Sequence, residues 1–316
     1  MTIGIAASGP WAGAGILAGL RAVEAIGRGA IGGFVSLAVI TEDQQLLRAE
    51  TQDGGTSGLF PKSPPEAILR APLAALISSG PNRPPPLSQF VAAAPDIGLV
   101  TGHRFPNLKT KGGDALNSLV LAAMQHGASA QDAIDHVIAA QQGFDAGFIS
   151  LSRDGTLGMG NTTTALRLVH KGAARQTCTE TGAEVATIHN AIQPSKAITT
   201  LSNEIVLDEM RQRVTRIKKI TLEVGLKVHQ GDETSIHIDD TFTATQVMHP
   251  DAKHLGQETF FGLGDRVQIL HQGTVIGWLG SEPFMVIKEG AIASLDGHEQ
   301  VHLPVHLLDP QEKPIS

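Results

Sequence analysis

A pentapeptide that occurs twice, in nearly identical form, constrains the fold of this chain more than any other feature. "GFVSL" occupies residues 33–37 and "GFISL" occupies residues 147–151. Each copy begins an apolar run, which is followed by a polar turn and by a second run that ends in Thr, Gly or Asn. This order is typical of a β-hairpin. We therefore expect both pentapeptides to be buried central strands, each paired with its own return strand, in one sheet or in facing sheets.

Helical signals precede both hairpins. Residues 2–7 indicate a buried strand, and the small-residue run 11–26 indicates a helix that ends at Gly27. Before the second copy, apolar residues recur at helical spacing in residues 114–126 and again in residues 129–141. Two helix–hairpin units of this kind can stack their sheets face to face with the helices outside. An internal duplication and two unrelated buried hairpins both fit the pattern.

A proline-rich segment separates the two units. Residues 60–86 contain one apolar stretch between clusters of proline, and we expect a short helix there. Residues 97–106 then indicate a strand and a turn.

The pattern changes after Thr164. Residues 195–218 have the spacing of an amphipathic helix that becomes basic toward its end, as the helix dipole favours. From Ile220 onward, short runs that alternate or contain β-branched residues predict a succession of strands. We therefore divide the chain into an α/β domain, residues 1–200, and a mainly β domain, residues 215–306.

Composition restricts the partners of the protein. The chain of 316 residues has a formal net charge of −7, which argues against a broad nucleic-acid or anionic-membrane surface. Its one cysteine, Cys178, excludes an intrachain disulfide and a cysteine-rich zinc site. The glycine motif "GPWAGAG" lacks the ending of a phosphate-binding loop. We expect a small-molecule ligand and no cofactor, and we leave a homo-oligomer open.

The apolar residues 1–20 differ from a targeting segment. They lack a basic n-region and are interrupted by several glycines and a proline, unlike a secretory signal or a membrane span. We expect a strand, a turn and a buried helix there, and a cytoplasmic protein.

Two segments carry a resemblance to a known enzyme family. Residues 126–138, "HGASAQDAIDHVI", and residues 145–162, "DAGFISLSRDGTLGMGNT", combine a helix with a hairpin that ends in Asn-Thr. This combination resembles the later subunit of the isoaspartyl peptidase and asparaginase family. Residues 29–56 resemble the nucleophile hairpin of that family, with Gly54 and Gly55 at the end of the return strand.

The resemblance implies a fold, a reaction and a set of site residues. The family belongs to the N-terminal nucleophile (Ntn) hydrolases, in which a Thr, Ser or Cys with a free α-amine attacks an amide and the amine serves as base. The implied fold class is α+β, an Ntn-hydrolase-like αββα layered sandwich, here with a β-rich C-terminal portion. The implied substrate-binding residues are Thr51, Asp53, Gly54, Gly55, Asn161 and Thr162.

The chain departs from the family pattern at its reacting groups. Asp53 stands where the family has a threonine, and a carboxylate cannot act as a neutral donor. Ala30 stands where the nucleophile belongs, or Phe34 if the register shifts, and neither can attack a carbonyl carbon. Thr2 gains a free α-amine if the initiator methionine is removed, and it is the candidate catalytic residue. Cys178 is the other candidate, although a lone cysteine is commonly a small buried apolar residue.

A catalytic Thr2 would need a donor for the oxyanion. We expect its hydroxyl group to face the end of the return strand at residues 51–55. The backbone N–H groups of Gly54 and Gly55 would then be the available donors.

Histidines gather in the second half of the chain. His298, His302 and His306 are spaced by four residues, and Pro304 argues against a helix there. On a strand all three face one side but lie about 13 Å apart, which is too far to share one metal ion. We therefore expect a solvated strand face and no metal site. The alternative is a turned geometry that binds a metal, to which residues 249–254 could contribute.

Three functions remain open from the sequence. The resemblance implies an amidohydrolase that acts on a small amide, such as an asparaginyl or isoaspartyl compound. The missing nucleophile at Ala30 favours a non-catalytic small-molecule binding or structural protein on the same framework. A metal-dependent hydrolase that uses the C-terminal histidines is the third.

Overall fold

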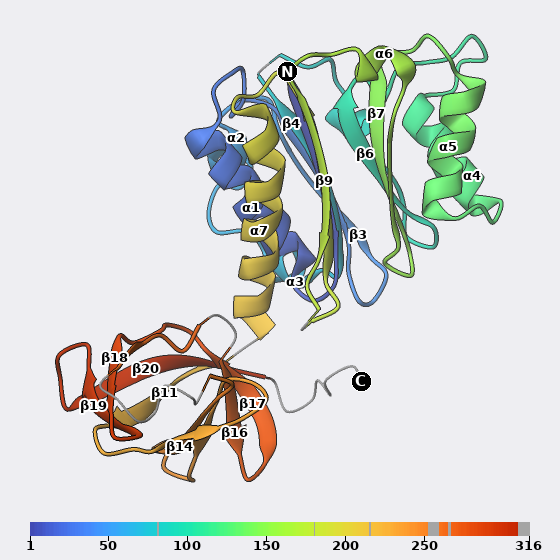
Figure 1. The fold of residues 1–316 in the computed structure, drawn as a ribbon. Helices are drawn as coiled ribbons and strands as arrows, with labels where there is room; N and C mark the ends of the chain where they lie inside the picture. Colours follow the sequence, from blue (N-terminus) through green and yellow to red (C-terminus); the bar gives the residue numbers. More distant parts are fainter. Residues whose placement is uncertain (81, 180, 215, 252–258, 265–266, 309–316) are drawn as a thin grey trace. The chain divides into compact units, whose positions relative to one another are not determined.

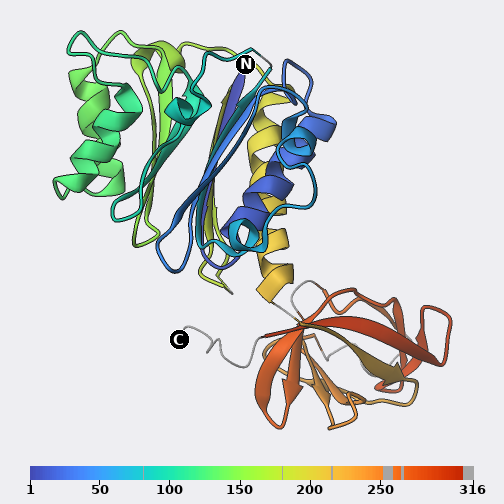
Figure 2. The ribbon, with the colours of Figure 1, turned by 180° about the vertical axis from the view of Figure 1, so that it is seen from behind.

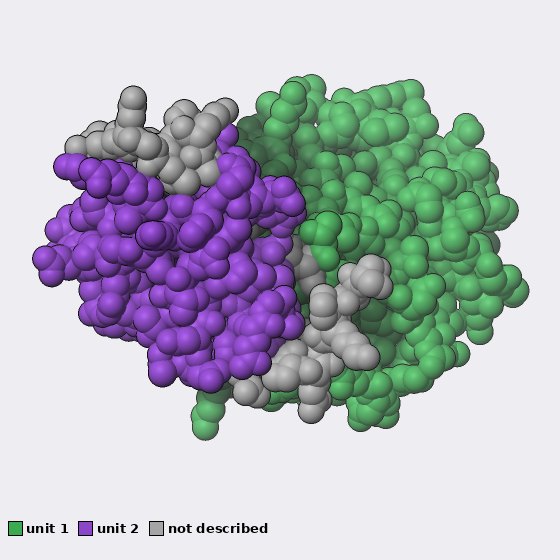
Figure 3. All heavy atoms as spheres, turned by 60° about the horizontal axis from the view of Figure 1, so that its bottom comes forward, with its two compact units in different colours: residues 1–211, 314–316 green, residues 212–313 purple. Residues whose placement is uncertain are grey.

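The computed structural model of the chain describes residues 1–80, 82–179, 181–214, 216–251, 259–264 and 267–308. It divides into two compact units, residues 1–211 and residues 212–313, which Figure 3 colours green and purple. The first unit mixes helices with two β-sheets, and the second consists of strands. The fold class is therefore α+β with a β-rich C-terminal portion.

The larger sheet of the first unit has six strands, and every neighbouring pair in it is antiparallel. In spatial order they are β3 (Leu46–Thr51), β2 (Val35–Ile40), β4 (Leu73–Ser79), β1 (Thr2–Ser8), β10 (Glu184–Asn190) and β9 (Lys171–Thr177). The N-terminal strand β1 is thus an interior strand. Its first residue lies at the same end of the sheet as the last residues of β3, β4 and β10.

The smaller sheet has four strands, also antiparallel. They are β5 (Ala92–Ala94), β6 (Gly98–Arg104), β7 (Ala146–Ser152) and β8 (Leu157–Asn161). The last residue of β6 and the last residue of β8 lie at the same end, because both strands run antiparallel to β7.

Long helices cover the outer face of each sheet (Figures 1 and 2). The helices α1 (Ala12–Ile26) and α7 (Ser195–Val214) pack on the six-stranded sheet, and α4 (Leu116–Gln125) and α5 (Ala130–Ala140) pack on the four-stranded sheet. Short helical turns connect the strands: α2 (Gly55–Gly58), α3 (Glu66–Arg70), η1 (Leu87–Phe90) and α6 (Thr163–Leu166).

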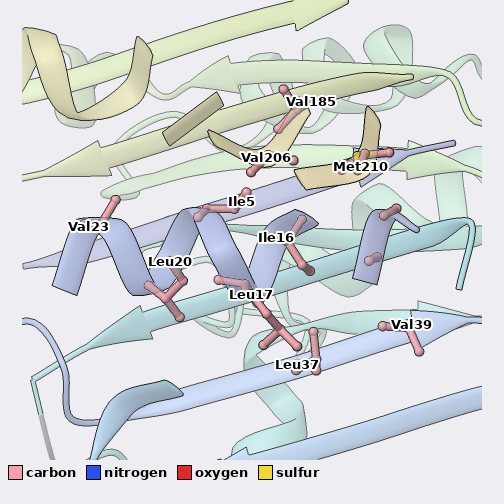
Figure 4. Close-up of a cluster of buried hydrophobic side chains, with 14 of the residues drawn as sticks. Ile5, Ile16, Leu17, Leu20, Val23, Leu37, Val39, Val185, Val206 and Met210 are labelled. Atoms are coloured by element: carbon pink, nitrogen blue, oxygen red, sulfur yellow. The ribbon is translucent and has the colours of Figure 1, made fainter. Parts of the chain in front are cut away.

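Strand alternation sorts the apolar residues into separate layers. In β1, Ile3 and Ile5 face the helices, whereas Ala6 belongs to the cluster between the two sheets. Figure 4 shows the helix-side cluster, in which Ile16 and Leu17 of α1 pack over the sheet. Because side chains alternate between faces of a strand, Thr2 and Gly4 point to the same side as Ala6, toward the four-stranded sheet.

The two copies of the pentapeptide are confirmed as buried interior strands. The first begins β2, which pairs with its return strand β3, and the second lies in β7, which pairs with its return strand β8. The two sheets face each other, because Ala38 and Ile40 of the first copy's strand share one buried cluster with Ile149 and Leu151 of the second.

Two expectations for secondary structure were wrong in part. The segment 60–86 contains the expected helix, α3, but also the interior strand β4, because Pro72 ends the helical stretch and the apolar run after it fills the gap between β1 and β2. The helix expected over residues 195–218 ends at Val214, because the β-branched residues that follow it join β11 (Arg216–Glu223).

The second unit is built from two sheets. The seven-stranded sheet has the order β11, β20 (Gln300–Leu307), β17 (Thr274–Leu279), β16 (Gln268–His271), β13 (Ser235–Ile238), β14 (Ala244–His249) and β12 (Val228–Gln230). The three-stranded sheet contains β15 (Thr259–Phe261), β18 (Met285–Lys288) and β19 (Ala291–Leu295). Both sheets contribute to one apolar core. Within the described ranges of the whole chain, no helix is long and apolar enough to cross a membrane.

Candidate functional site

A group of polar side chains lies where the apolar layer between the two sheets ends. The residues are Thr2 at the start of β1, Asn190 at the end of β10, His103 near the end of β6 and Asn161 at the end of β8. Strand register explains why Thr2 and Asn190 lie side by side, because they are paired directly across β1 and β10. Alternation brings all four onto the inner faces of the sheets.

Hydrogen bonds connect these four residues into one network. The Thr2 hydroxyl group donates to Asn190 Oδ1 over 2.8 Å and accepts from the backbone N–H of Arg104. The Thr2 backbone N–H also donates to Asn190 Oδ1, over 3.2 Å. His103 lies between the two asparagines, with Nδ1 3.3 Å from Asn190 Oδ1 and Nε2 2.7 Å from Asn161 Oδ1. Thr2 is thereby linked to both sheets.

Burial controls the charge of His103. Its side chain is fully buried, and this burial lowers its pKa from the ordinary value of 6.5 to about 4, against the opposing effect of the two asparagines. The imidazole is therefore neutral near pH 7, and a neutral imidazole carries one N–H. It can donate to only one of the two carboxamide oxygens, and the shorter contact favours Nε2 as the donor.

This lowered pKa predicts a loss of stability in acid. An unfolded histidine binds a proton below about pH 6.5, whereas folded His103 stays neutral down to about pH 4, so the unfolded state binds more protons in between. We expect the free energy of unfolding to fall by about 2 kcal/mol between about pH 7.5 and about pH 5 because of His103 alone. Urea unfolding curves at the two pH values measure this difference.

Variants separate His103 from the other titrating groups. In His103→Gln, the change in the free energy of unfolding between the two pH values should be smaller by about 2 kcal/mol. His136→Gln, on the exposed side of α5, is the control and should keep the wild-type change. Burial also lowers the pKa of His189, so part of the acid effect should remain in His103→Gln. An unchanged pH dependence in His103→Gln would show that His103 is not held neutral.

Three positively charged groups lie near the network: the guanidinium groups of Arg104 and Arg83 and the α-amine of Met1. Arg104 follows His103 on β6, and its guanidinium binds Asp145 through Nε, at 2.7 Å, and Nη2. Arg83 donates from Nε to Ser79 Oγ over 2.9 Å, and Ser79 is the register partner of Thr2 in β4. Burial lowers the pKa of the Met1 α-amine, and the charges of Arg83 and Arg104 lower it further.

The structure separates the sequence-predicted substrate residues into two places. Asn161 is joined to Thr2 through His103 and Asn190. Thr51, at the end of β3, is separated from Thr2 by strands β2 and β4. The Thr2 hydroxyl group has its hydrogen bonds with β10 and β6, so the expectation that it faces residues 51–55 was wrong.

The donors expected at the glycine turn have other partners. The Gly54 N–H donates to the carboxylate of Asp53 over 2.9 Å, and the Gly55 N–H donates to Gly33 O over 2.9 Å. Both glycines have positive φ and lead into the short helix α2, whose Thr56 is bound by Glu24. These contacts give the turn a structural role.

Three other residues that were considered from the sequence, Thr162, Cys178 and Ala30, have ordinary structural positions. Thr162 caps α6, because its hydroxyl group accepts from the Ala165 N–H over 3.3 Å. Cys178 is buried and belongs to the apolar cluster beneath α1 and α7. Ala30 is exposed in the loop before β2.

Two of the three C-terminal histidines lie on a strand, as expected, and the third does not. His302 and His306 are in β20, and His298 lies in the exposed turn before it. Residues 252–254 of the second histidine segment lie outside the described residues. In the part of the chain that the structure describes, no three His, Cys, Asp or Glu side chains are grouped closely enough to hold a metal ion.

A cavity lies at the opposite end of the sheets from Thr2. Its volume is about 670 Å³, and it is lined by Ser8 at the end of β1, by Ile40 at the end of β2 and by the turn around Asp154 between β7 and β8. The buried network at Thr2 is chemically richer, since it combines a hydroxyl group, an imidazole and two carboxamides, so we place the candidate site there.

Comparison with known families follows the division into two units. Residues 2–219 match a family described as a domain of unknown function, DUF6963. The chain belongs to the DUF6963 family. Residues 225–300 match a second domain of unknown function, DUF7259. No curated protein matches the chain. All four residues of the Thr2 network lie within the DUF6963 match.

Proposed function

We propose that the DUF6963 domain is an Ntn-hydrolase-like amidohydrolase whose nucleophile is Thr2 after removal of Met1. The observation that carries the proposal is the position of Thr2, whose backbone nitrogen and hydroxyl group are both held by one oxygen of Asn190 at the end of the paired sheets. The packing of two antiparallel sheets with helices on their outer faces supports an αββα sandwich of the Ntn type.

The contacts of Thr2 suit an N-terminal nucleophile. When Met1 is absent, the nitrogen that now donates to Asn190 becomes an α-amine on the same residue as the hydroxyl group. A serine or threonine hydroxyl is a weak nucleophile, and an adjacent base activates it. Burial lowers the pKa of the Met1 amine, the charges of Arg83 and Arg104 lower it further, and the same effects would favour a neutral amine on Thr2 near pH 7.

The reaction would proceed in two steps. The Thr2 Oγ1 attacks the carbonyl carbon of the amide while the α-amine takes the hydroxyl proton, and that proton passes to the leaving nitrogen as the C–N bond breaks. A water molecule then attacks the carbonyl carbon of the acyl-threonine ester while it gives a proton to the same amine. That proton passes to Thr2 Oγ1 as the ester C–O bond breaks, which releases the carboxylic acid and restores the free threonine. The products are an acid and ammonia or an amine.

The oxyanion would need donors other than those of the glycine turn. Gly54 and Gly55 already donate elsewhere. The candidate donors are the carboxamide NH2 group of Asn190, whose oxygen binds Thr2, that of Asn161, which is linked to Asn190 through His103, and the guanidinium of Arg83, which binds the strand partner of Thr2. Such preorganised donors commonly supply the largest stabilisation of an oxyanion.

A non-catalytic binding protein on the same framework is the second candidate. The observation that favours it is that Thr2 is only 3% exposed and that its hydroxyl group is already hydrogen-bonded on both sides. A nucleophile must lose one of these bonds to attack, whereas a binding protein can keep both.

The state of the Thr2 nitrogen distinguishes the two functions. We would prepare one form that begins at Thr2 and a second form with a single alanine before Thr2, both verified by mass spectrometry. The amidohydrolase predicts ammonia release from small amides by the first form and at least about a hundredfold less by the second, because an amide nitrogen cannot act as base. Equal rates for the two forms, or ligand binding without turnover by both, would contradict the catalytic proposal.

A further inference from the structure

The positively charged side chain of Arg83 is hydrogen-bonded to an uncharged group. Its Nε donates to the neutral hydroxyl group of Ser79 over 2.9 Å, and its backbone N–H donates to Gln52 Oε1 over 2.9 Å. The side chain of Gln52 returns a bond to the Arg83 carbonyl oxygen, so the residue is fixed at both main-chain polar groups. Across the ranges that the structure describes, no carboxylate forms an ion pair with Arg83.

The other charges nearby do not compensate for it. The charge of Arg104 acts on Arg83, and the guanidinium of Arg104 already binds Asp145 Oδ2 with both Nε and Nη2. Together with the α-amine of Met1, the group contains three cations and the single carboxylate of Asp145. A neutral α-amine on Thr2 after removal of Met1 would still leave two cations, the guanidinium groups of Arg83 and Arg104, against that one carboxylate.

Burial makes this surplus costly for the free protein. Arg83 is half-buried, and desolvation followed by repulsion from Arg104 lowers its pKa from the ordinary value. Such a site lowers its free energy by binding an anion, because an arginine held in place forms short charge-assisted hydrogen bonds with an anion's oxygen atoms.

We propose that Arg83, supported by Arg104, binds a carboxylate group of a small ligand beside Thr2. The assignment rests on the position of the guanidinium. Ser79 is the register partner of Thr2, and its side chain lies on the same inner face of the six-stranded sheet. Arg104 reaches the site from the facing sheet, where its backbone N–H binds the Thr2 hydroxyl group. A ligand anchored there would therefore place its remaining atoms next to Thr2.

This proposal deepens the proposed function, because under that function the carboxylate belongs to the amide substrate. The carboxylate site itself needs no catalysis. Neutral amides of the same size would lack the anchoring charge, and we expect the protein to discriminate against them through Arg83.

Binding can be measured without turnover on the Thr2→Ala variant. The probes are malonate and its uncharged counterpart malonamide, with inorganic phosphate as a second anion, all at constant ionic strength. Isothermal titration calorimetry and thermal shift should detect malonate binding, little malonamide binding and weaker phosphate binding. Adding Arg83→Gln should weaken malonate binding by roughly tenfold or more.

Two further variants keep the test decisive. Arg83→Lys retains the charge and should bind malonate more tightly than Arg83→Gln does, even though it loses the planar fork. Arg21→Gln, an exposed arginine on α1, should leave malonate binding unchanged. Tighter binding of phosphate than of malonate, equal binding of malonate and malonamide, or an equal loss in Arg21→Gln would overturn the carboxylate site.

The outcomes separate this proposal from the proposed function. Arg83-dependent malonate binding without amide turnover by the form that begins at Thr2 would support the carboxylate site and contradict the hydrolase. Turnover by that form, together with malonate binding that is unchanged in Arg83→Gln, would support the hydrolase and overturn the carboxylate site.

Discussion

Thr2→Ala is expected to remove amide hydrolysis by the form that begins at residue 2, with a loss of at least about a thousandfold in kcat. The reason is that the attacking oxygen is absent, and removing a covalent nucleophile leaves only what the rest of the site contributes. Ammonia release from a panel of small carboxylate-bearing amides measures the loss. Thr2→Ser keeps the hydroxyl group and should retain measurable turnover.

Folding must be measured alongside activity in these variants. Thr2 is buried, and Thr2→Ala removes two hydrogen bonds of its hydroxyl group, one to Asn190 Oδ1 and one from the Arg104 N–H. We expect a cost of about 1–3 kcal/mol in the free energy of unfolding, and Thr2→Ser should cost less. Ser8→Ala, at the other end of β1, is the control and should keep full activity. Unchanged turnover in a folded Thr2→Ala variant would exclude Thr2 as the nucleophile.

Gly4→Ala is expected to destabilise the protein strongly through one added methyl group. A Cβ at Gly4 would lie 2.5 Å from the carbonyl oxygen of Gly102, so the backbones of β1 and β6 would have to separate. Overpacking of this kind commonly costs about 1–3 kcal/mol, and a rigid backbone neighbour places this case at the upper end. Chemical denaturation measures the change in the free energy of unfolding.

A second glycine provides the matched control. A Cβ at Gly112 would meet its nearest atom, the hydroxyl oxygen of Thr110, at an ordinary 3.6 Å. Gly112→Ala should therefore change stability by no more than about 0.5 kcal/mol. If both variants have the same stability, the close approach of the two sheets at Gly4 is not a constraint on folding.

Much of the first unit could be predicted from the sequence because its hairpins have strong local signals. The repeated pentapeptide predicted β2 and β7 and their return strands, and it left open whether the two strands share one sheet or lie in facing sheets, of which the structure shows the second. Strand β4 was missed because "LAALISS" is an apolar run without alternation, and such a run fits a buried strand and a buried helix equally well. Only pairing with β1 and β2 on either side decides between them.

The candidate site was predicted less completely because its residues come from strands distant in sequence. Thr2 and Asn161 were candidates from the resemblance, but Asn190 and His103 were not. The run "EVATIHN", which forms β10 and ends in Asn190, contains β-branched residues that could have indicated a strand. Its pairing with β1 spans most of the unit, and no local pattern specifies it. Arg83 carried no sequence signal, because its role depends on which groups the fold places around its guanidinium.

The backbone contact at Gly4 and Gly102 determines how a molecule can reach Thr2. Where an added methyl group finds no room, a substrate cannot pass between the sheets. A route to Thr2 would therefore run through the end of the layers at which β1 begins, beside the loops after β4 and β6 that contain Arg83 and Phe105. These two loops would then select among substrates. Related domains could differ in the lengths and residues of the loops and still keep the same residues around Thr2.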